Sequence, residues 1–252
     1  MKLWNFRGEQ NNIADALQLS MPDSAVISVT GAGGKTSLIC AWARELAAAG
    51  RRTVITTTTH MAHPDHFREP YEGIPVLYAD DVSADFLKNV DSLLEEHNLA
   101  MIVSSDPERS VKVMAPPDRV MDHLYKTADA VLIEADGSRR MPLKWPAPWE
   151  PVIPVNTDIT VCVAGLSALG QSAEDVMYRW DHLPERFQRD TVDEALVCAV
   201  LASPDGGLKG VQGEFRVFLN QADTEEIQKT ASHLQQMLAV SGIRSAWGTL
   251  IY

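Results

Sequence analysis

The chain has 252 residues, of which 45% are hydrophobic, so it is long enough to bury a large core in one or two domains. Its 34 acidic and 22 basic side chains give a formal net charge of −12, which argues against general binding to nucleic acids or anionic membranes, because both need a basic face. The first residues lack the apolar core of a signal peptide, and no apolar run is long enough to span a membrane.

Apolar runs of strand length alternate with helical patterns along most of the chain. In chain order we expect a strand at residues 24–30, a helix at 35–50, strands at 52–59 and 74–79, a helix at 84–97, a strand at 99–105, a helix at 118–128, strands at 129–136 and 158–165, a helix at 191–203, a strand at 214–223, a helix at 224–242 and a strand near 243–251. The alternation predicts an α/β fold, with a mostly parallel sheet covered by helices on both faces, in a single domain over residues 1–252. Several strands are continuous apolar runs, which is typical of strands buried on both faces.

Cys40, Cys162 and Cys198 are far apart and show no C-x-x-C spacing. This pattern argues against a disulfide framework or a zinc site and predicts buried, reduced thiols. Together with the N-terminus, it leads us to expect a cytoplasmic protein.

The segment GAGGKTS, between the first expected strand and the first expected helix, has the composition of a phosphate-binding loop. Such a loop needs glycines for positive φ, a lysine for the β- and γ-phosphates, a hydroxyl for Mg²⁺ and a helix N-terminus. Val29 stands where the usual pattern G-x-x-x-x-G-K-[ST] has its first glycine, which gives the shorter spacing G-x-x-G-K-T of some amide-forming ligases. Thr30 stands where the deviant-loop NTPases carry a second lysine, so no lysine donated across a dimer is predicted. The expected nucleotide contacts here are Gly31, Ala32, Gly33, Gly34, Lys35, Thr36 and Ser37, which makes the predicted fold P-loop NTPase-like.

Two carboxylates, Glu134 and Asp136, end the apolar run VLIEADG. In P-loop enzymes a carboxylate at this position holds Mg²⁺ or orients the attacking water. We therefore expect Thr36, Glu134 and Asp136 at the metal, and Lys35, Glu134 and Asp136 in catalysis. The alternative is that Asp136 and Gly137 only form a turn.

The motif FLNQAD follows another apolar strand and resembles the guanine-specificity motif N-K-x-D. Asn220 and Asp223 would then contact the base, with Gln221 in place of the usual lysine. The alternative is that Asp223 caps the following helix. The choice between ATP and GTP stays open.

The run TTTTHMAHPDHF offers hydroxyls at residues 56–59, expected beside the loop, and histidines at His60, His63 and His66. Three histidines in seven residues suggest a metal site, but Pro64 breaks any helix that would align them, and solvated histidines are the commoner case. A role for His60 near the γ-phosphate or the substrate is the sharper hypothesis.

Residues 137–156 are rich in proline and tryptophan and do not read as a flexible linker, because bulky side chains there favour burial. The segment is predicted to be irregular. A pocket for an anionic partner and a packed flap are equally good interpretations of its side chains Arg139, Arg140, Lys144, Trp145 and Trp149.

The motifs TGAGGKTS, TTTTHM, EADGSRRMPLKWPAPWEPVIP, AGLSALGQ and FLNQAD, in this order, resemble the selenium-dependent hydroxylase accessory protein family, also called selenium-cofactor biosynthesis proteins. The resemblance covers roughly residues 20–250. It implies a P-loop protein that assists maturation of selenium-dependent molybdenum hydroxylases, with such a hydroxylase or its cofactor-assembly proteins as partner. The positions it implies as functional are Gly31, Gly33, Gly34, Lys35, Thr36, Thr59, His60, Glu134, Asp136, Lys144, Glu150 and Pro151. Trp149 stands where the family pattern has a histidine, so no role of that histidine carries over.

The sequence thus predicts a protein that binds ATP or GTP with Mg²⁺ and is an NTPase or phosphate-activating enzyme. Two alternatives remain: an ATP-dependent ligase or kinase acting on a small acidic metabolite, and a non-enzymatic, nucleotide-gated binding protein. The ligases with this loop usually carry additional substrate domains, for which 252 residues leave little room. The sequence does not indicate the oligomeric state.

Overall fold

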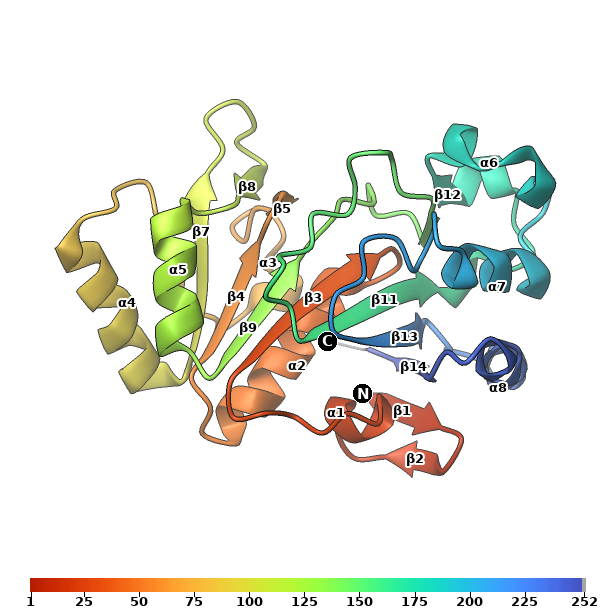
Figure 1. Ribbon diagram of the computed structural model, residues 1–252, viewed down its shortest axis with the longest axis horizontal. Helices are drawn as coiled ribbons and strands as arrows, with labels where there is room; N and C mark the ends of the chain where they lie inside the picture. The colour runs from red at the N-terminus through yellow and green to blue at the C-terminus, as the bar shows by residue number, and fades with distance from the viewer. Residues whose placement is uncertain (251–252) are drawn as a thin grey trace.

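The computed structural model describes residues 1–250 and confirms an α/β fold with a mostly parallel sheet and helices on both faces (Figure 1). Eight strands form the parallel part of the sheet, in the spatial order β6-β7-β4-β9-β3-β11-β13-β14. Their bounds are β3 (Ala25–Gly31), β4 (Thr53–Thr57), β6 (Val76–Tyr78), β7 (Leu99–Ser105), β9 (Ala130–Glu134), β11 (Ile159–Gly165), β13 (Glu214–Asn220) and β14 (Ser245–Thr249). The last expected strand reached residue 251, which lies outside the described residues.

Short antiparallel strands extend both edges of the sheet, and the sequence patterns did not indicate them. They are β1 (Lys2–Asn5) and β2 (Gly8–Gln10) beside β14, and β5 (His60–Ala62) and β8 (Lys112–Met114) beside β7. Leu3 of β1 pairs with Gly248 of β14, and the rings of Trp4 and Trp247 stack with centroids 4.6 Å apart. A separate parallel pair joins β10 (Leu143–Lys144) to β12 (Met177–Tyr178).

The helices cover the sheet in two layers. They are α1 (Ile13–Ala16), α2 (Lys35–Ala48), α3 (Arg68–Tyr71), α4 (Ala84–His97), α5 (Asp118–Thr127), α6 (Ala173–Val176), α7 (Glu194–Ala202) and α8 (Glu225–Val240), with 3-10 turns η1 (Leu166–Ala168), η2 (Trp180–His182) and η3 (Glu185–Phe187). Helices α1 and α2 pack on one face, whereas α4 and α5, and separately α7 and α8, pack on the other (Figure 1). Helix α2 ends one residue before Ala49, and Gly50 follows with φ 81°, as the glycine stop predicts.

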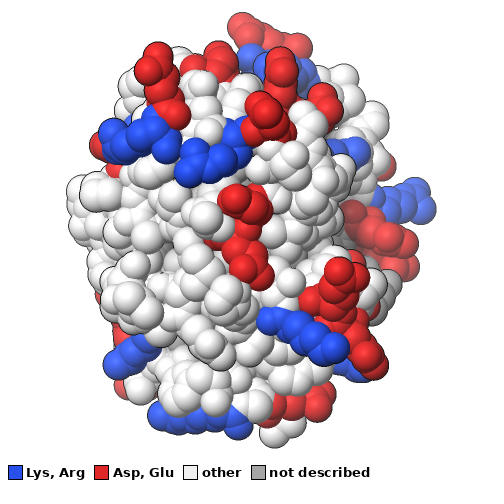
Figure 2. Space-filling model, turned by 90° about the vertical axis from the view of Figure 1, so that its right-hand side faces the viewer, with Lys and Arg blue, Asp and Glu red and all other residues white. Residues whose placement is uncertain are grey.

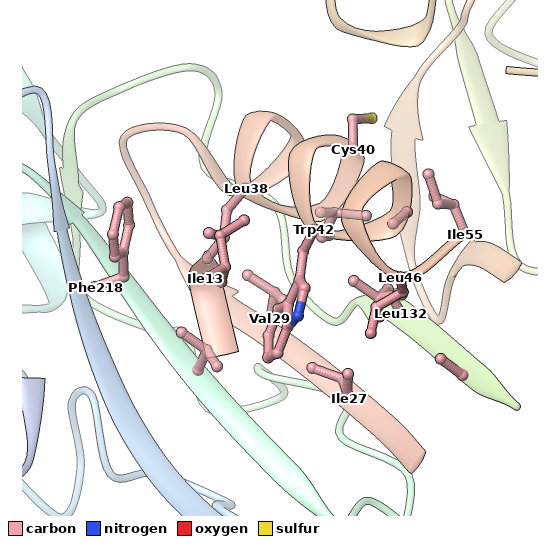
Figure 3. Close-up of a cluster of buried hydrophobic side chains, with 14 of the residues drawn as sticks. Ile13, Ile27, Val29, Leu38, Cys40, Trp42, Leu46, Ile55, Leu132 and Phe218 are labelled. Carbon is pink, nitrogen blue, oxygen red and sulfur yellow. The ribbon is translucent and has the colours of Figure 1, made fainter. Parts of the chain in front are cut away.

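Strand β3 shows why these runs are continuously apolar. Ile27 and Val29 point to the α2 face and pack with Trp42 (Figure 3). Val26 points to the opposite face, with α4 and α5. All seven residues of β3 are buried. Because both faces are buried, the strand is apolar except at Ser28, whose hydroxyl is hydrogen-bonded to that of Thr157, and at Thr30.

The segment 137–156 is irregular apart from β10, but its tryptophans differ. Trp145 is buried against Phe187, with ring centroids 5.9 Å apart. Trp149 is 67% exposed, so the expectation of burial is wrong for this residue.

Cys40 and Cys162 are buried free thiols, and Cys198 is a half-buried one. No helix within residues 1–250 has both the length and the apolar content to cross a membrane. On the side of the molecule that carries α6, α7 and α8, acidic and basic side chains lie interspersed around a broad uncharged area (Figure 2).

Candidate functional site

The loop between β3 and α2 has the backbone of a phosphate loop. Gly31, Gly33 and Gly34 all have positive φ, at 89°, 81° and 118°. A Cβ on Gly33 would lie 2.3 Å from the backbone nitrogen of Gly165, so no side chain fits there. Val29, at the position of the missing glycine, is buried inside β3 in register with Glu134. The first positive φ of the loop is at Gly31, so the strand position occupied by Val29 needs no glycine.

The N-terminus of α2 is open to an anion. Its cap residue is Gly34, which provides no side-chain hydrogen bond, and the first turn contains no acidic residue. The first backbone N–H groups of a helix have no partner within the helix, and the helix dipole adds partial positive charge. A phosphate group fits this position.

Lys35, the first residue of α2, is only 3% exposed. Its Nζ donates to the carbonyl of Gly31 at 2.8 Å and lies 3.2 Å from Oδ1 of Asp136 and 3.9 Å from Oε1 of Glu134. Burial by itself lowers the pKa of Lys35, but the two carboxylates outweigh it, and the pKa is raised. The lysine is therefore held charged, next to the open helix end.

Glu134 and Asp136 occupy different positions around this lysine. Thr36 Oγ1 donates to Oε2 of Glu134 at 2.7 Å, and burial raises the pKa of Glu134 although Lys35 and Thr36 oppose the shift. Asp136 Oδ2 accepts from the Gly31 N–H at 3.0 Å. Asp136 is therefore part of the loop's hydrogen-bond network and more than a turn residue.

A hard divalent cation fits the oxygen atoms gathered here. Thr36 and Glu134 present a hydroxyl and a carboxylate 2.7 Å apart, and Asp136 Oδ1 makes no hydrogen bond to the described residues, although Lys35 Nζ lies 3.2 Å from it. Mg²⁺ prefers such oxygen ligands and takes the remainder from water and phosphate. The donor set therefore suits Mg²⁺.

A chain of buried charges continues from Asp136 away from the loop. Lys144 Nζ donates to Asp136 Oδ2 and to Glu150 Oε2, both at 2.9 Å, and Arg179 Nη2 donates to Glu150 Oε1 at 3.1 Å. Glu150 was indicated by the family resemblance alone, whereas Lys144 was also expected in a pocket for an anionic partner or in a packed flap. Arg179 was missed, because only the pairing of β10 with β12 brings it here.

Asn220, at the end of β13, contacts the loop directly. Its Nδ2 donates to the carbonyl of Gly33 at 2.8 Å, and its Oδ1 is buried without a hydrogen bond. Gln221 has φ 66°, and its Oε1 accepts from Ser167 at 2.6 Å. Asn220 thus fixes the conformation of the phosphate loop through Nδ2, while its Oδ1 has no hydrogen-bond partner among the described residues.

Asp223 does not cap the following helix, so that alternative is wrong. The cap of α8 is Thr224, whose side chain accepts from the N–H of Ile227 at 3.3 Å. Asp223 is exposed, and its carboxylate makes no hydrogen bond or ion pair with the residues that the structure describes. The carboxylate is available to a ligand.

The threonine run is used mainly inside the fold. Thr56 Oγ1 donates to the Ile102 carbonyl and Thr57 Oγ1 to the Glu134 carbonyl, both at 2.7 Å. The expectation that this run lines the phosphate loop with hydroxyls is therefore wrong for these two residues. They instead join β4 to its neighbours.

None of the three histidines contacts the loop in the part of the chain that the structure describes. His60 Nε2 lies 3.4 Å from Asp106 Oδ2, and His63 stacks on Tyr78 with ring centroids 5.7 Å apart. No group of three histidine, cysteine or carboxylate side chains placed to hold a metal ion occurs within residues 1–250. The catalytic role of His60 stays a prediction without a contact to support it.

Comparison with known proteins places the chain in a family. The model of the YqeC protein family matches residues 27–181. A curated relative, the uncharacterized protein YqeC of Escherichia coli (strain K12), is 36% identical over 237 residues, which cover 88% of this chain and 86% of that protein.

Two solved structures overlap with the chain, each with a TM-score of 0.44. One is a chain of the MinC:MinD cell division protein complex of Aquifex aeolicus, at 11% identity, covering 88% of this chain and 79% of that one. The other is chloroplast FtsY from Physcomitrella patens, at 13% identity, covering 91% of this chain and 59% of that one. The matched family model and the curated relative together show that the chain belongs to the YqeC family.

Proposed function

We propose that this protein binds a nucleoside triphosphate with Mg²⁺ and acts as an NTPase or phosphate-activating enzyme. The observation that carries the proposal is the buried Lys35, which is held charged beside an uncapped helix N-terminus in a glycine loop. An anion at the helix end would replace the Gly31 carbonyl as the partner of Lys35 Nζ, 2.8 Å away in the structure. This exchange uses groups that are already aligned.

The residues around Lys35 are proposed to bind Mg²⁺, to fix the loop and to orient the attacking water. Thr36 and Glu134 would hold the Mg²⁺, which supplies positive charge against the β- and γ-phosphate oxygens when bound. Asp136 fixes the first N–H of the loop and keeps Lys35 charged. We propose that Glu134, whose pKa is raised by burial, also orients the attacking water.

Asp223 and the unsatisfied Oδ1 of Asn220 are proposed to recognise the base. An aspartate accepts hydrogen bonds from guanine N–H groups, so their participation predicts a preference for GTP over ATP. Gln221 lacks the charge of the usual lysine, which weakens the preference.

Thermal unfolding with slowly hydrolysed ATP and GTP analogues, with and without Mg²⁺, tests the proposal. A ligand at about a hundred times its Kd stabilises by about 2.7 kcal/mol, which raises Tm by about 5–10 °C in a chain of this size. We expect this shift to need Mg²⁺ and to disappear in Lys35→Ala, each protein being compared with its own ligand-free Tm. The matched control is Lys88→Ala, which removes an exposed lysine from α4. The absence of any shift in the wild-type protein would refute nucleotide binding.

The family resemblance supports a finer proposal: the nucleotide drives a step in the maturation of selenium-dependent molybdenum hydroxylases. A strain lacking the gene should lose the activity of such a hydroxylase while its protein level persists. Re-expression of the wild-type chain should restore the activity, and Lys35→Ala should not. Full hydroxylase activity in the deletion strain would rule this role out.

A further inference from the structure

The turn that follows β9 brings two arginines to the edge of the phosphate loop. Met141 N–H donates to the Ser138 carbonyl at 3.0 Å, and the two central residues, Arg139 and Arg140, have φ 48° and 64°. Two consecutive positive φ angles are typical of a type I′ turn, which prefers asparagine and glycine. The Met141 carbonyl in turn accepts the Gly33 N–H at 3.1 Å. The turn is therefore tied directly to the loop.

The guanidinium groups of these arginines have no acidic partner. Arg139 lies over the ring of Tyr178, 5.4 Å from its centroid, and Arg140 lies over Phe67 at 3.7 Å. Neither makes a hydrogen bond or an ion pair with any described residue, although the chain carries a net charge of −12. Stacking on a ring orients a guanidinium and leaves its N–H groups for an anion.

The other cations near Tyr178 are already paired with carboxylates, whereas within residues 1–250 these two arginines are not. Arg179 and Lys144 lie over the same Tyr178 ring, at 4.8 and 5.7 Å, but both are already paired with Glu150. The inner charges balance as three carboxylates against three cations, namely Glu134, Asp136 and Glu150 against Lys35, Lys144 and Arg179. Arg139 and Arg140 therefore add positive charge that these ion pairs do not balance.

We propose that Arg139 and Arg140 form, with Tyr178, a subsite that binds the acid group of a small anionic second substrate beside the nucleotide. The role of this subsite in binding a co-substrate rests on the proposed nucleotide binding. Its ability to bind an anion does not depend on that proposal. Guanidinium groups recognise phosphate and carboxylate alike. Two arginines with positive φ strain the backbone of the turn. Such strain persists where a function requires it, which supports a functional role for the arginines.

Trp149 provides the readout, since it is exposed and its ring lies 5.2 Å from the guanidinium carbon of Arg179. The protein is saturated with Mg²⁺ and a non-hydrolysable nucleotide analogue, which occupies the phosphate loop, and is titrated with inorganic phosphate or, separately, with succinate. Tryptophan fluorescence reports binding, and Trp149→Phe identifies the part of the signal that comes from this ring. The test variant is the double substitution Arg139→Asn, Arg140→Gly. The control, Arg7→Asn, removes an arginine stacked on Phe6 in the N-terminal hairpin.

We expect the double variant to bind the anion at least about tenfold more weakly, as the loss of a charge-assisted hydrogen bond predicts, and to bind the nucleotide as the wild type does. Its Tm should rise by about 2–4 °C, because asparagine and glycine relieve the turn. A merely structural role would lower Tm instead. Whichever of phosphate and succinate binds tighter identifies the acid group.

Two results would overturn the subsite: equal anion affinity in the double variant and the wild type, or no binding of either anion by the wild type. A parallel loss of nucleotide affinity in the double variant would also overturn it, because the arginines would then serve the nucleotide's own phosphates. The same titration in Lys35→Ala without nucleotide separates the two proposals. Anion binding that survives there would show that the subsite stands without the nucleotide, whereas the proposed function falls only if the wild-type chain binds no nucleotide.

Discussion

At the scale of single residues, the Glu134 carboxyl gives the site a measurable pH dependence. Its folded pKa lies above the ordinary value of 4.5, mainly because of burial. Ionising it therefore costs stability. The cost is absent below about pH 4.5 and grows by about 1.4 kcal/mol for each pH unit above that value, until the pH passes the folded pKa.

Glu134→Gln keeps an acceptor for Thr36 and has no proton to lose. We expect the variant's Tm to match the wild type near pH 4 and to exceed it once the pH rises above about 4.5, whereas the Mg²⁺-dependent part of the nucleotide shift is lost. Thermal unfolding from pH 4 to 8, with and without Mg²⁺ and nucleotide, measures both effects. A variant that is less stable than the wild type at pH 7 would contradict this assignment.

Asp223 and Thr224 are neighbours with separable roles. Thr224→Ala removes the cap of α8 and should cost about 1 kcal/mol of unfolding free energy without changing the preferred nucleotide. Asp223→Ala should leave stability within about 0.5 kcal/mol, because the side chain is exposed, and should reduce the preference for GTP. Urea unfolding and competition between the two nucleotides check both. An unchanged base preference in Asp223→Ala would remove this residue from the base site.

At the scale of elements, the glycines at the two ends of α2 separate two reasons for glycine. Gly50 has φ 81° in open space, so Gly50→Ala adds backbone strain alone and should cost about 1 kcal/mol. Gly33→Ala adds the same strain and a clash with the Gly165 backbone, and should cost about 1–3 kcal/mol more. Gly34→Ala meets the movable Asn220 amide and should fall between them. Urea unfolding ranks the three, and equal costs would mean that the loop is less closely packed than described.

The long elements could be predicted from the sequence because each carries its own signal. Helix α2 has an apolar stripe and a glycine stop, and β3 is a nearly continuous apolar run. Strands β5, β8, β10 and β12 have two or three residues each and exist only through partners far away in the chain. No local pattern could indicate them.

The same limit applies to the candidate site. Glu134 and Asp136 could be found because they end an apolar strand and face the loop across the sheet edge. Arg179 and Tyr178 lie near Lys144 only through the β10–β12 pair. The sequence also could not show that Arg139 lacks an ion-pair partner among the described residues, because that depends on where the carboxylates lie in space.

At the scale of the whole molecule, the reactivity of the three cysteine thiols measures how well the two helix layers shield the sheet from solvent. Burial raises the pKa of Cys40 and Cys162 to about 12 and that of the half-buried Cys198 to about 11. Iodoacetamide at pH 8 should label Cys198 first, and Cys40 and Cys162 only as fast as the fold opens, because the thiolate is the reactive form. Mass spectrometry of peptides from timed samples follows each site, with urea-unfolded protein as the control. Rapid labelling of Cys162 in the native protein would contradict its place under α7 and α8.

The pairing of β1 with β14 means that Lys2–Asn5 must wait for a strand that is translated much later in the chain. Until Ser245–Thr249 emerges, Lys2–Asn5 has only β2 beside it, and Trp4 lacks its stacking partner. A hairpin of two short strands is marginal by itself. The N-terminal hairpin can therefore lock into place only after β14 has been translated, and products that stop short of β14 keep both an open sheet edge and an exposed tryptophan. Chaperones and proteases that bind such surfaces would distinguish a chain that stops before β14 from one that contains it.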